Sequence, residues 1–484
     1  MTTNLPPDDR RVGGHHLARI LGDWRGNDAA YTGLASRIRL LVLDGRLPLH
    51  TRLPAERELA ETLEVSRTTV AAAYERLRAD GYLRSRRGAG TWTDVPTSGH
   101  HRGPAPWASL SPDDMIDLAH AAPSAPVEVL HHAADTAVAQ LARYLPTHGY
   151  DPLGLAPLRL SIADRYTARG LPTTAEQILV TSGAQSAFAL VLGALASPGD
   201  RVLVEHPTYP NVLDAIARAG CRAVPVGFTG AGWDLEMMAA TFRQAAPRLA
   251  YLIPDFHNPT GRCMDAAQRR ELVELAQRTR TPLVIDETVA ELGLDHAAPP
   301  PVAVHDSAGI VITTGSTSKT FWGGLRIGWL RAPAPMVRRV AAVRASADLA
   351  SPIFEQLATV ELLRHVEETL ALRQETFRAQ RDHLVNLVRT RLPGWQVSVP
   401  PGGLSLWVDL GAPVSSAMAV AAERYGVQVS AGPRFGLDGA FEQYLRLPYT
   451  LPTAELDSAV ERLAAAAATV ATTEPVSAPV GDLV

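Results

Sequence analysis

Five short apolar runs between residues 178 and 314 place the strongest constraint on how this chain folds. They are rich in β-branched residues and span 178–181, 201–205, 249–253, 282–286 and 310–314. Longer segments with helical periodicity separate them, at 185–196, 210–219 and 266–280. Strands that alternate with helices predict an α/β domain whose mostly parallel sheet is covered on both faces.

Polar side chains follow each of these runs where the strand would end. In chain order they belong to Ser182 and Gln185, where the backbone amides of Ala184 and Gln185 open a helix, then to Tyr209, Asn258, Asp286, and Ser316 with Lys319. Taken singly, each has an ordinary structural explanation as a helix cap, a turn residue or a core residue. Ligands of open α/β sheets bind at the carboxyl ends of the strands, so the set as a whole predicts a binding site at that edge.

Lys319 is the only lysine among the 46 lysine and arginine side chains. Most single lysines are solvated surface residues. Arginine, however, cannot lose a proton at neutral pH and act as an amine nucleophile. A Schiff base to a carbonyl cofactor requires such an amine, and pyridoxal phosphate is the most common cofactor of this kind. We therefore expect Lys319 to be the catalytic residue.

The other polar residues at this edge match the groups that a pyridoxal 5'-phosphate site needs besides the lysine. Asp286 is expected to keep the pyridine nitrogen protonated, Asn258 to reach the phenolic oxygen, and Tyr209 to stack on the ring. The phosphate needs hydrogen-bond donors, and a helix N-terminus offers backbone amides for this purpose. We expect these donors to come from Ala184, Gln185, Ser316 and Arg326, with Ser318 beside the lysine in the same cofactor site.

This arrangement resembles the fold-type I, aspartate-aminotransferase-like enzymes from about residue 115 to 472. The resemblance rests on Ser-x-x-Lys at 316–319 with Arg326 seven residues on, and on Asn-Pro-Thr-Gly at 258–261. The spacings of 28 and 33 residues from Asn258 to Asp286 to Lys319 also match. The resemblance implies an arginine late in the chain that binds the α-carboxylate of a substrate or effector, and Arg446 is the candidate.

Two positions depart from the family pattern. The family usually has a tyrosine shortly after the ring aspartate, whereas this chain has Thr288, a shorter substitute for contacting the phenolic oxygen. The family also has a tyrosine five residues before Gly154 that reaches the phosphate of the neighbouring subunit. Gly149 stands there, and Tyr150 is the candidate replacement.

The region 31–93 has a different pattern, with three short helices followed by two strands. Apolar residues at helical spacing predict helices near 34–44, after Pro54, and after Ser66, a favourable N-cap. Two strands then flank a basic, glycine-containing tip at 85–89. This order predicts a winged helix-turn-helix, although a small helical domain with a solvated charged face has a similar pattern.

Local charge favours DNA binding, because residues 31–93 contain 11 Arg against 7 Asp and Glu in a chain of net charge −4. Leu-Pro-Ala-Glu-Arg-Glu-Leu-Ala at 53–60 and Val-Ser-Arg-Thr-Thr-Val at 65–70 resemble the DNA-binding signature of the GntR family. The resemblance implies a major-groove surface and a wing near the minor groove. The residues implied are Arg57, Ser66, Arg67, Thr68 and Thr69 for the groove, and Arg87 and Gly88 for the wing. Arg57 and Arg67 alternatively contact only phosphates and position the protein without specifying sequence.

Length and composition indicate several domains in a reducing compartment. We expect a loose arm at 1–30, the DNA-binding domain at 31–93, a Pro-rich linker at 94–114, the effector domain at 115–472 and a tail at 473–484. The effector domain should include a smaller α+β lobe after about residue 333. Two cysteines without metal-ligand spacing, and no apolar run of 18 residues, predict a cytoplasmic protein.

The combination resembles the MocR/GabR-type bacterial transcription regulators over nearly the whole chain. The resemblance implies a homodimer that binds double-stranded promoter DNA, with an amino acid or amine effector acting at the Lys319 Schiff-base site. One alternative is a working aminotransferase to which the DNA-binding domain at 31–93, here called the head, is attached as an accessory. Residual transamination by the regulator also stays open. Another alternative is a sensor of pyridoxal phosphate itself that controls vitamin B6 synthesis.

Overall fold

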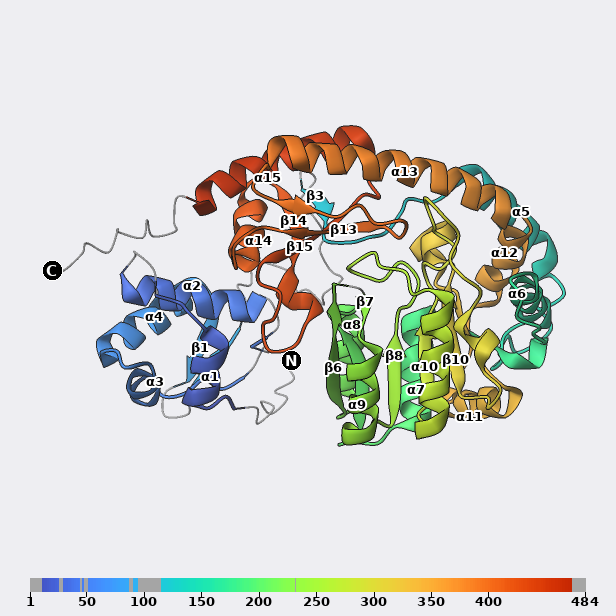
Figure 1. Ribbon diagram of the computed structural model, residues 1–484, viewed down its shortest axis with the longest axis horizontal. Helices are drawn as coiled ribbons and strands as arrows, with labels where there is room; N and C mark the ends of the chain where they lie inside the picture. The colour runs from blue at the N-terminus through green and yellow to red at the C-terminus, as the bar shows by residue number, and fades with distance from the viewer. Residues whose placement is uncertain are drawn as a thin grey trace. The chain divides into compact units, whose positions relative to one another are not determined.

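A computed structural model of the protein describes residues 11–25, 29–43, 46–47, 51–86, 90–94, 115–230 and 232–471 (Figure 1). These residues form two compact units. The first unit comprises the described residues up to 117, together with 410–445 and 459–471. The second unit comprises 118–409 and 446–458. Most of the proposed linker, the wing tip at 87–89 and the proposed tail lie outside the described residues.

The first unit contains the winged helix-turn-helix that the sequence predicted. Its elements are α1 (Gly14–Leu21), α2 (Ala30–Leu43), α3 (Glu56–Leu63), α4 (Arg67–Ala79), β1 (Leu83–Arg86) and β2 (Gly90–Thr93). Ser66 caps α4, since its side chain accepts a hydrogen bond from the amide of Thr69. The antiparallel pair β1–β2 forms the wing. A buried cluster that includes Leu34, Leu59 and Val70 holds the helices together.

The expectation of a loose arm at 1–30 was wrong for its second half. Leu17, Ile20 and Leu21 recur at helical spacing and are buried in the core of the head, so they make α1 part of that domain. The backbone amide of Gly14 also donates a hydrogen bond of 2.9 Å to Oε1 of Glu58 at the start of α3. The short apolar stripe was overlooked because polar residues and glycines surround it.

The second unit is built on an eight-stranded sheet with the strand order β4-β11-β10-β9-β8-β5-β6-β7. All five predicted strands are present, as β4 (Ile178–Thr181), β5 (Arg201–His206), β8 (Leu249–Leu252), β9 (Leu283–Asp286) and β10 (Val311–Ser316). The others are β6 (Arg222–Thr229), β7 (Gly232–Trp233) and β11 (Gly328–Arg331). β5, β6, β8, β9 and β10 pair in parallel, and β11 pairs antiparallel with both β10 and β4. The carboxyl ends of β4, β5, β8, β9 and β10 therefore lie at one edge.

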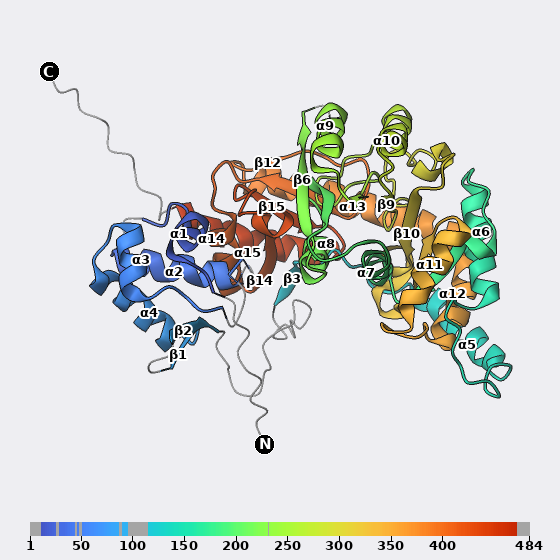
Figure 2. The same ribbon diagram turned by 90° about the horizontal axis from the view of Figure 1, so that it is seen from below.

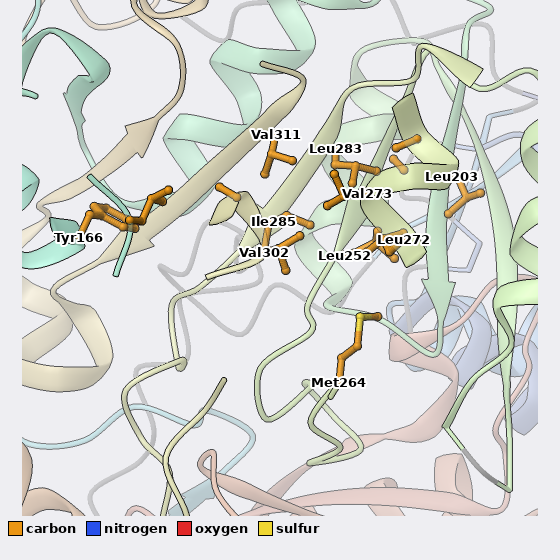
Figure 3. Packing of buried hydrophobic residues seen from close by; sticks show 14 of the residues in the cluster. Tyr166, Leu203, Leu252, Met264, Leu272, Val273, Leu283, Ile285, Val302 and Val311 are labelled. Atoms are coloured by element: carbon orange, nitrogen blue, oxygen red, sulfur yellow. The ribbon is translucent and has the colours of Figure 1, made fainter. Parts of the chain in front are cut away.

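Helices cover both faces of this sheet, as Figure 2 shows. One face packs against α7 (Ala184–Leu195), α8 (Pro210–Arg218) and α11 (Ala334–Arg344). The other packs against α6 (Ala156–Ala168), α9 (Leu235–Ala245) and α10 (Ala266–Thr279). Successive strand residues alternate between the two cores. Val284, for example, packs with α7 and its neighbours, whereas Leu283 and Ile285 join the opposite cluster (Figure 3).

Long helices and short strands make up the rest of the described chain. The second unit adds β12 (Gln396–Val397), antiparallel to β13 (Ser405–Asp409), and three helices, α5 (Val127–Leu141), α12 (Ile353–Arg364) and α13 (Val366–Arg391). The first unit adds α14 (Ser415–Arg424) and β14 (Val427–Ala431). β3 (Ile116–Leu118), β15 (Tyr444–Pro448) and α15 (Thr453–Ala471) complete these elements. The elements after residue 333 mix long helices with short strands, as the sequence predicted for an α+β lobe, whereas β3 and α5 come from an earlier part of the chain. Among the described residues, no helix combines the length and apolarity that crossing a membrane requires.

Candidate functional site

Lys319 lies one turn beyond the carboxyl end of β10, in a short π-helical turn at Ser318–Trp322. Its Nζ atom donates a hydrogen bond of 2.6 Å to the backbone carbonyl of Ala121. Burial, reinforced by the positive charge of Arg446, lowers the pKa of Lys319 from 10.5 to about 8, although Asp286 opposes the shift. About a tenth of such an amine is neutral at pH 7. The environment of this lysine thus raises the share of its nucleophilic form far above that of a solvated lysine.

Asp286 ends β9, and two donors hold its carboxylate. The hydroxyl of Tyr251 donates to Oδ2 at 2.5 Å, and the backbone amide of Thr288 donates to Oδ1 at 2.8 Å. Tyr251 lies on the neighbouring strand β8 and is buried. Burial and the nearby carboxylate hold the pKa of Tyr251 well above its usual value, so the phenol stays protonated and donates. A carboxylate oriented in this way is suited to face a protonated ring nitrogen.

Arg446, on β15, is buried and points to Asn258 in the turn after β8. Its Nη1 atom donates to Oδ1 of Asn258 at 3.3 Å, and Nη2 donates to the backbone carbonyl of Ala119. The charge of Arg446 influences both Lys319 and Tyr209. The structure therefore brings the predicted carboxylate-binding arginine to the predicted cofactor residues.

Tyr209 immediately precedes α8, so the helix start places its ring. Its hydroxyl accepts a hydrogen bond of 2.7 Å from Nδ2 of Asn211. The backbone carbonyl of Asn211 in turn accepts one of 2.9 Å from Nε2 of Gln185. Burial and the charge of Asp286 raise the pKa of Tyr209 to about 12. This chain of hydrogen bonds links the proposed ring-stacking residue to the start of α7.

The proposed phosphate-binding residues gather around the N-terminus of α7. Nη2 of Arg326 donates a hydrogen bond of 2.6 Å to the carbonyl of Ser182, just before the first turn of the helix at Ala184. Gly183 has φ +108°, and a Cβ there would lie 2.9 Å from Nη2 of Arg326. Only glycine therefore leaves room for this close approach of guanidinium and backbone.

Two serines lie next to this group. The hydroxyl of Ser316 donates to Ser318 Oγ at 3.0 Å, and the amide of Ser318 donates to Ser316 Oγ at 3.1 Å. The amides in the first turn of an α-helix have no partner within the helix, so the start of α7 and these two serines together offer several hydrogen-bond donors that suit a phosphate group.

The donor set fits pyridoxal 5'-phosphate, with one nucleophilic amine, one oriented carboxylate, an aromatic ring and a donor-rich anion corner. A further observation supports the fit. Oγ1 of Thr288 is buried without a hydrogen-bond partner among the described residues. Buried hydroxyls ordinarily have such a partner, so this atom is available to the phenolic oxygen of the cofactor.

Tyr150 is not part of this cluster. Its side chain is exposed, and its ring stacks against that of His148 with centroids 5.8 Å apart. The proposed contact of Tyr150 with the phosphate of a neighbouring subunit stays a prediction.

Five of the predicted DNA-binding residues lie on α3 or at the start of α4. Arg57 on α3 and Arg67 at the start of α4 have side chains that are 84% and 73% exposed. Arg57 pairs with the exposed Glu61, and Arg67 pairs with the partly exposed Glu56. The hydroxyls of Thr68 and Thr69 lie 2.7 and 2.8 Å from that of Ser66 at the helix start. Arg87 and Gly88, which the sequence also predicts to contact DNA, lie outside the described residues.

Sequence reasoning missed three contributors to the site, namely Tyr251, Asn211 and the backbone carbonyls at 119–121. For Tyr251 the sequence did contain an indication of its role. A buried tyrosine needs a hydrogen-bond partner for its hydroxyl, and Tyr251 stands within an apolar strand next to the one that Asp286 ends. The carbonyls at 119–121 carried no signal, because any residue type can supply a backbone oxygen.

Comparison with known proteins identifies both parts of the chain. A family model for aminotransferase class I and II matches residues 113–463, and one for bacterial regulatory proteins of the gntR family matches residues 30–92. The uncharacterized HTH-type transcriptional regulator YisV of Bacillus subtilis is 28% identical over 84% of this chain and 90% of its own length. A Rhizobium meliloti protein named "Probable rhizopine catabolism regulatory protein MocR" is 31% identical over 62% of this chain and 64% of its own.

A solved structure of similar fold is the α-aminoadipate aminotransferase LysN of Thermus thermophilus. It has a TM-score of 0.69 and 26% identity, and the match covers 74% of this chain and 94% of LysN. That crystal structure holds N-(5'-phosphopyridoxyl)-L-leucine, an adduct of the cofactor with an amino acid.

Proposed function

The chain belongs to the aminotransferase class I and II family and carries a gntR-type DNA-binding head, and from this we propose that an amino compound at the Lys319 site controls promoter binding. The family's cofactor is pyridoxal 5'-phosphate, which agrees with the cofactor that the sequence predicted. The observation that carries the proposal is a DNA-binding domain on the same polypeptide as an aminotransferase domain that buries the single lysine, Lys319.

The residues of the site have distinct roles in this proposal. Lys319 holds the cofactor through its amine, Asp286 faces the ring nitrogen, and Arg326 and the start of α7 hold the phosphate. Bound pyridoxal phosphate supplies an electrophilic carbon to which a primary amine adds. Arg446 then selects amino compounds that carry a carboxylate, because its guanidinium binds two oxygens at once.

Control of DNA binding requires that the effector bind two arrangements of the protein with different affinities. The carbonyls of Ala119 and Ala121 contact Arg446 and Lys319, and they belong to the segment that follows the linker. An effector carboxylate that binds Arg446 competes with the carbonyl of Ala119, and a cofactor held by the Lys319 amine takes the place of the hydrogen bond to Ala121. In the proposal, this competition couples the site to the linker and the head.

We further propose that the protein is a cytoplasmic homodimer whose two heads bind two half-sites of one operator. Dimers of this kind bind half-sites about one helical turn of DNA apart, or a multiple of it.

The test is a promoter footprint of the cofactor-loaded protein, repeated with each of the amino acids and with simple amines. We expect one compound to change both the visible spectrum of the cofactor and the footprint. Arg446→Gln should abolish the response to carboxylated effectors, whereas Arg391→Gln, which removes an exposed arginine at the end of α13, should not. A footprint that no amino compound alters, although the spectrum changes, would refute the regulatory role.

A working aminotransferase is the second candidate, because the predicted cofactor residues together with Arg446 would permit the half-reaction, although Thr288 stands where the family usually has a tyrosine. Steady consumption of an amino donor with a keto-acid acceptor would favour it. A footprint that responds to the cofactor alone would instead favour a sensor of pyridoxal phosphate.

A further inference from the structure

Three potential metal ligands meet on the surface that α5 and α12 share in the second unit. They are His132 on α5, and Glu361 and His365 on α12. One ligand atom from each lies within 4.8 Å of the other two. The two helices pack against each other, and both ribbon views show them side by side (Figures 1 and 2). The cluster lies outside the cofactor site, and nothing in the proposed function uses it.

The distances match those between ligands of one zinc ion. Nε2 of His132 lies 3.6 Å from Oε1 of Glu361, and Nε2 of His365 lies 3.5 Å from the same oxygen. Ligands about 2.1 Å from a tetrahedral zinc ion are about 3.4 Å apart. Glu361 and His365 are four residues apart on α12 and therefore lie on one face of that helix.

The groups behind these ligands also suit a metal site. The side chain of Glu361 is only 8% exposed, and Nη1 of Arg364 donates to its Oε2 at 2.7 Å, which leaves Oε1 toward the two imidazoles. Nδ1 of His365 lies 4.0 Å from Oε2 of Glu368, on the side away from Glu361. That separation is too long for a hydrogen bond, so Glu368 adds negative charge near the second nitrogen of His365 without fixing the ring.

The site is open on one side, which provides an entry path for an ion. The side chains of His132 and His365 are 61% and 40% exposed, whereas the carboxylate between them is buried. Two imidazoles and one carboxylate, with a solvent-facing fourth position, are a ligand set that zinc accepts.

We propose that His132, Glu361 and His365 bind one divalent transition-metal ion, preferentially Zn²⁺, with water as the remaining ligand. The ion joins α5 to α12. Because α5 begins shortly after the segment 119–124, whose carbonyls contact Lys319, Arg446 and Arg373, the ion also anchors the helix that follows this segment.

The test uses the untagged full-length protein, freed of metal by a chelator and titrated with Zn²⁺ against a chromophoric competitor. We expect His132→Gln and His365→Gln each to weaken one zinc equivalent at least tenfold. His131→Gln, which changes the exposed neighbour of His132 on α5, should bind like the wild type.

A second measurement checks that the three residues coordinate one ion. Co²⁺ in place of Zn²⁺ should give the visible absorption of a four-coordinate site in the wild type and in His131→Gln, and lose it in His132→Gln. Absence of zinc binding by the wild type would overturn the proposal. So would equal binding by His131→Gln and His132→Gln, since the cluster would then be an ordinary ion pair.

Discussion

The hydroxyl of Tyr251 donates a 2.5 Å hydrogen bond to Oδ2 of Asp286 across two neighbouring parallel strands. The phenol is the donor, because burial and the carboxylate hold the pKa of Tyr251 well above its usual value. The bond orients the Asp286 carboxylate, and a carboxylate that faces the ring nitrogen keeps a bound pyridine ring protonated. A residue in the core of the sheet therefore supports the chemistry proposed at its edge.

Replacing Tyr251 with Phe should lower the free energy of unfolding by about 1.5–3 kcal/mol, because a hydrogen bond to a charged group is lost. Tyr449→Phe is the matched control. Tyr449 is equally buried, but its hydroxyl donates to a neutral acceptor, the carbonyl of Gly402, at 3.2 Å. There we expect a loss of about 1 kcal/mol. Urea denaturation of both cofactor-free variants measures the difference, and equal losses would contradict the charged role of Asp286.

The capture of pyridoxal phosphate by Lys319 should depend on pH with a midpoint near 8. Since burial lowers the pKa of the amine from 10.5 to about 8, its neutral fraction rises about tenfold per pH unit below 8 and levels off above it. Stopped-flow absorbance of the cofactor-free protein mixed with pyridoxal phosphate measures this rate. Lys319→Arg should give no signal, and because the chain has no other lysine, the background is low.

The charge of Arg446 contributes to that midpoint. Removing it in Arg446→Gln takes away a positive charge that disfavours the protonated lysine, so the midpoint should move to higher pH. Arg391→Gln should leave it unchanged. A midpoint that does not respond to Arg446→Gln would mean that the two side chains are not close in solution.

Arg67→Ala should weaken promoter binding by about 1–3 kcal/mol if the side chain contacts a base edge. Arg76→Ala is the control, because it removes the same charge from an exposed position nine residues further along α4. A gel-shift series at several salt concentrations separates the two effects. Equal losses for both variants, with equal changes in salt slope, would assign Arg67 to phosphate contact alone.

Leu17→Ala should destabilise the head by about 2–5 kcal/mol, since Leu17 is fully buried in its core. His15→Ala removes an exposed side chain from the same helix and should change stability by less than about 0.5 kcal/mol. Hydrogen exchange of the backbone amides in α4 reports on the head separately from the second unit. Unchanged exchange in Leu17→Ala would show that α1 is dispensable to the domain.

The amino-acid sequence by itself determined the division into a winged helix-turn-helix and an α/β aminotransferase fold. Both signals are local. Apolar periodicity defines strands and helices, and motifs such as Ser-x-x-Lys and Asn-Pro-Thr-Gly occupy short stretches of chain. The direction of β4, β5, β8, β9 and β10 then follows from parallel pairing. For that reason Asp286, Asn258 and Lys319 could be expected at one edge from their order alone.

Only the tertiary structure decided which groups partner these residues. Tyr251 and Asp286 are 35 positions apart, and Ala119 and Arg446 are 327 apart. Their hydrogen bonds depend on sheet register and on the return of the late strand β15 to the site. Likewise, His132 meets Glu361 only because α5 packs against α12. Such contacts depend on side-chain geometry between distant segments, and local periodicity carries no information about that geometry.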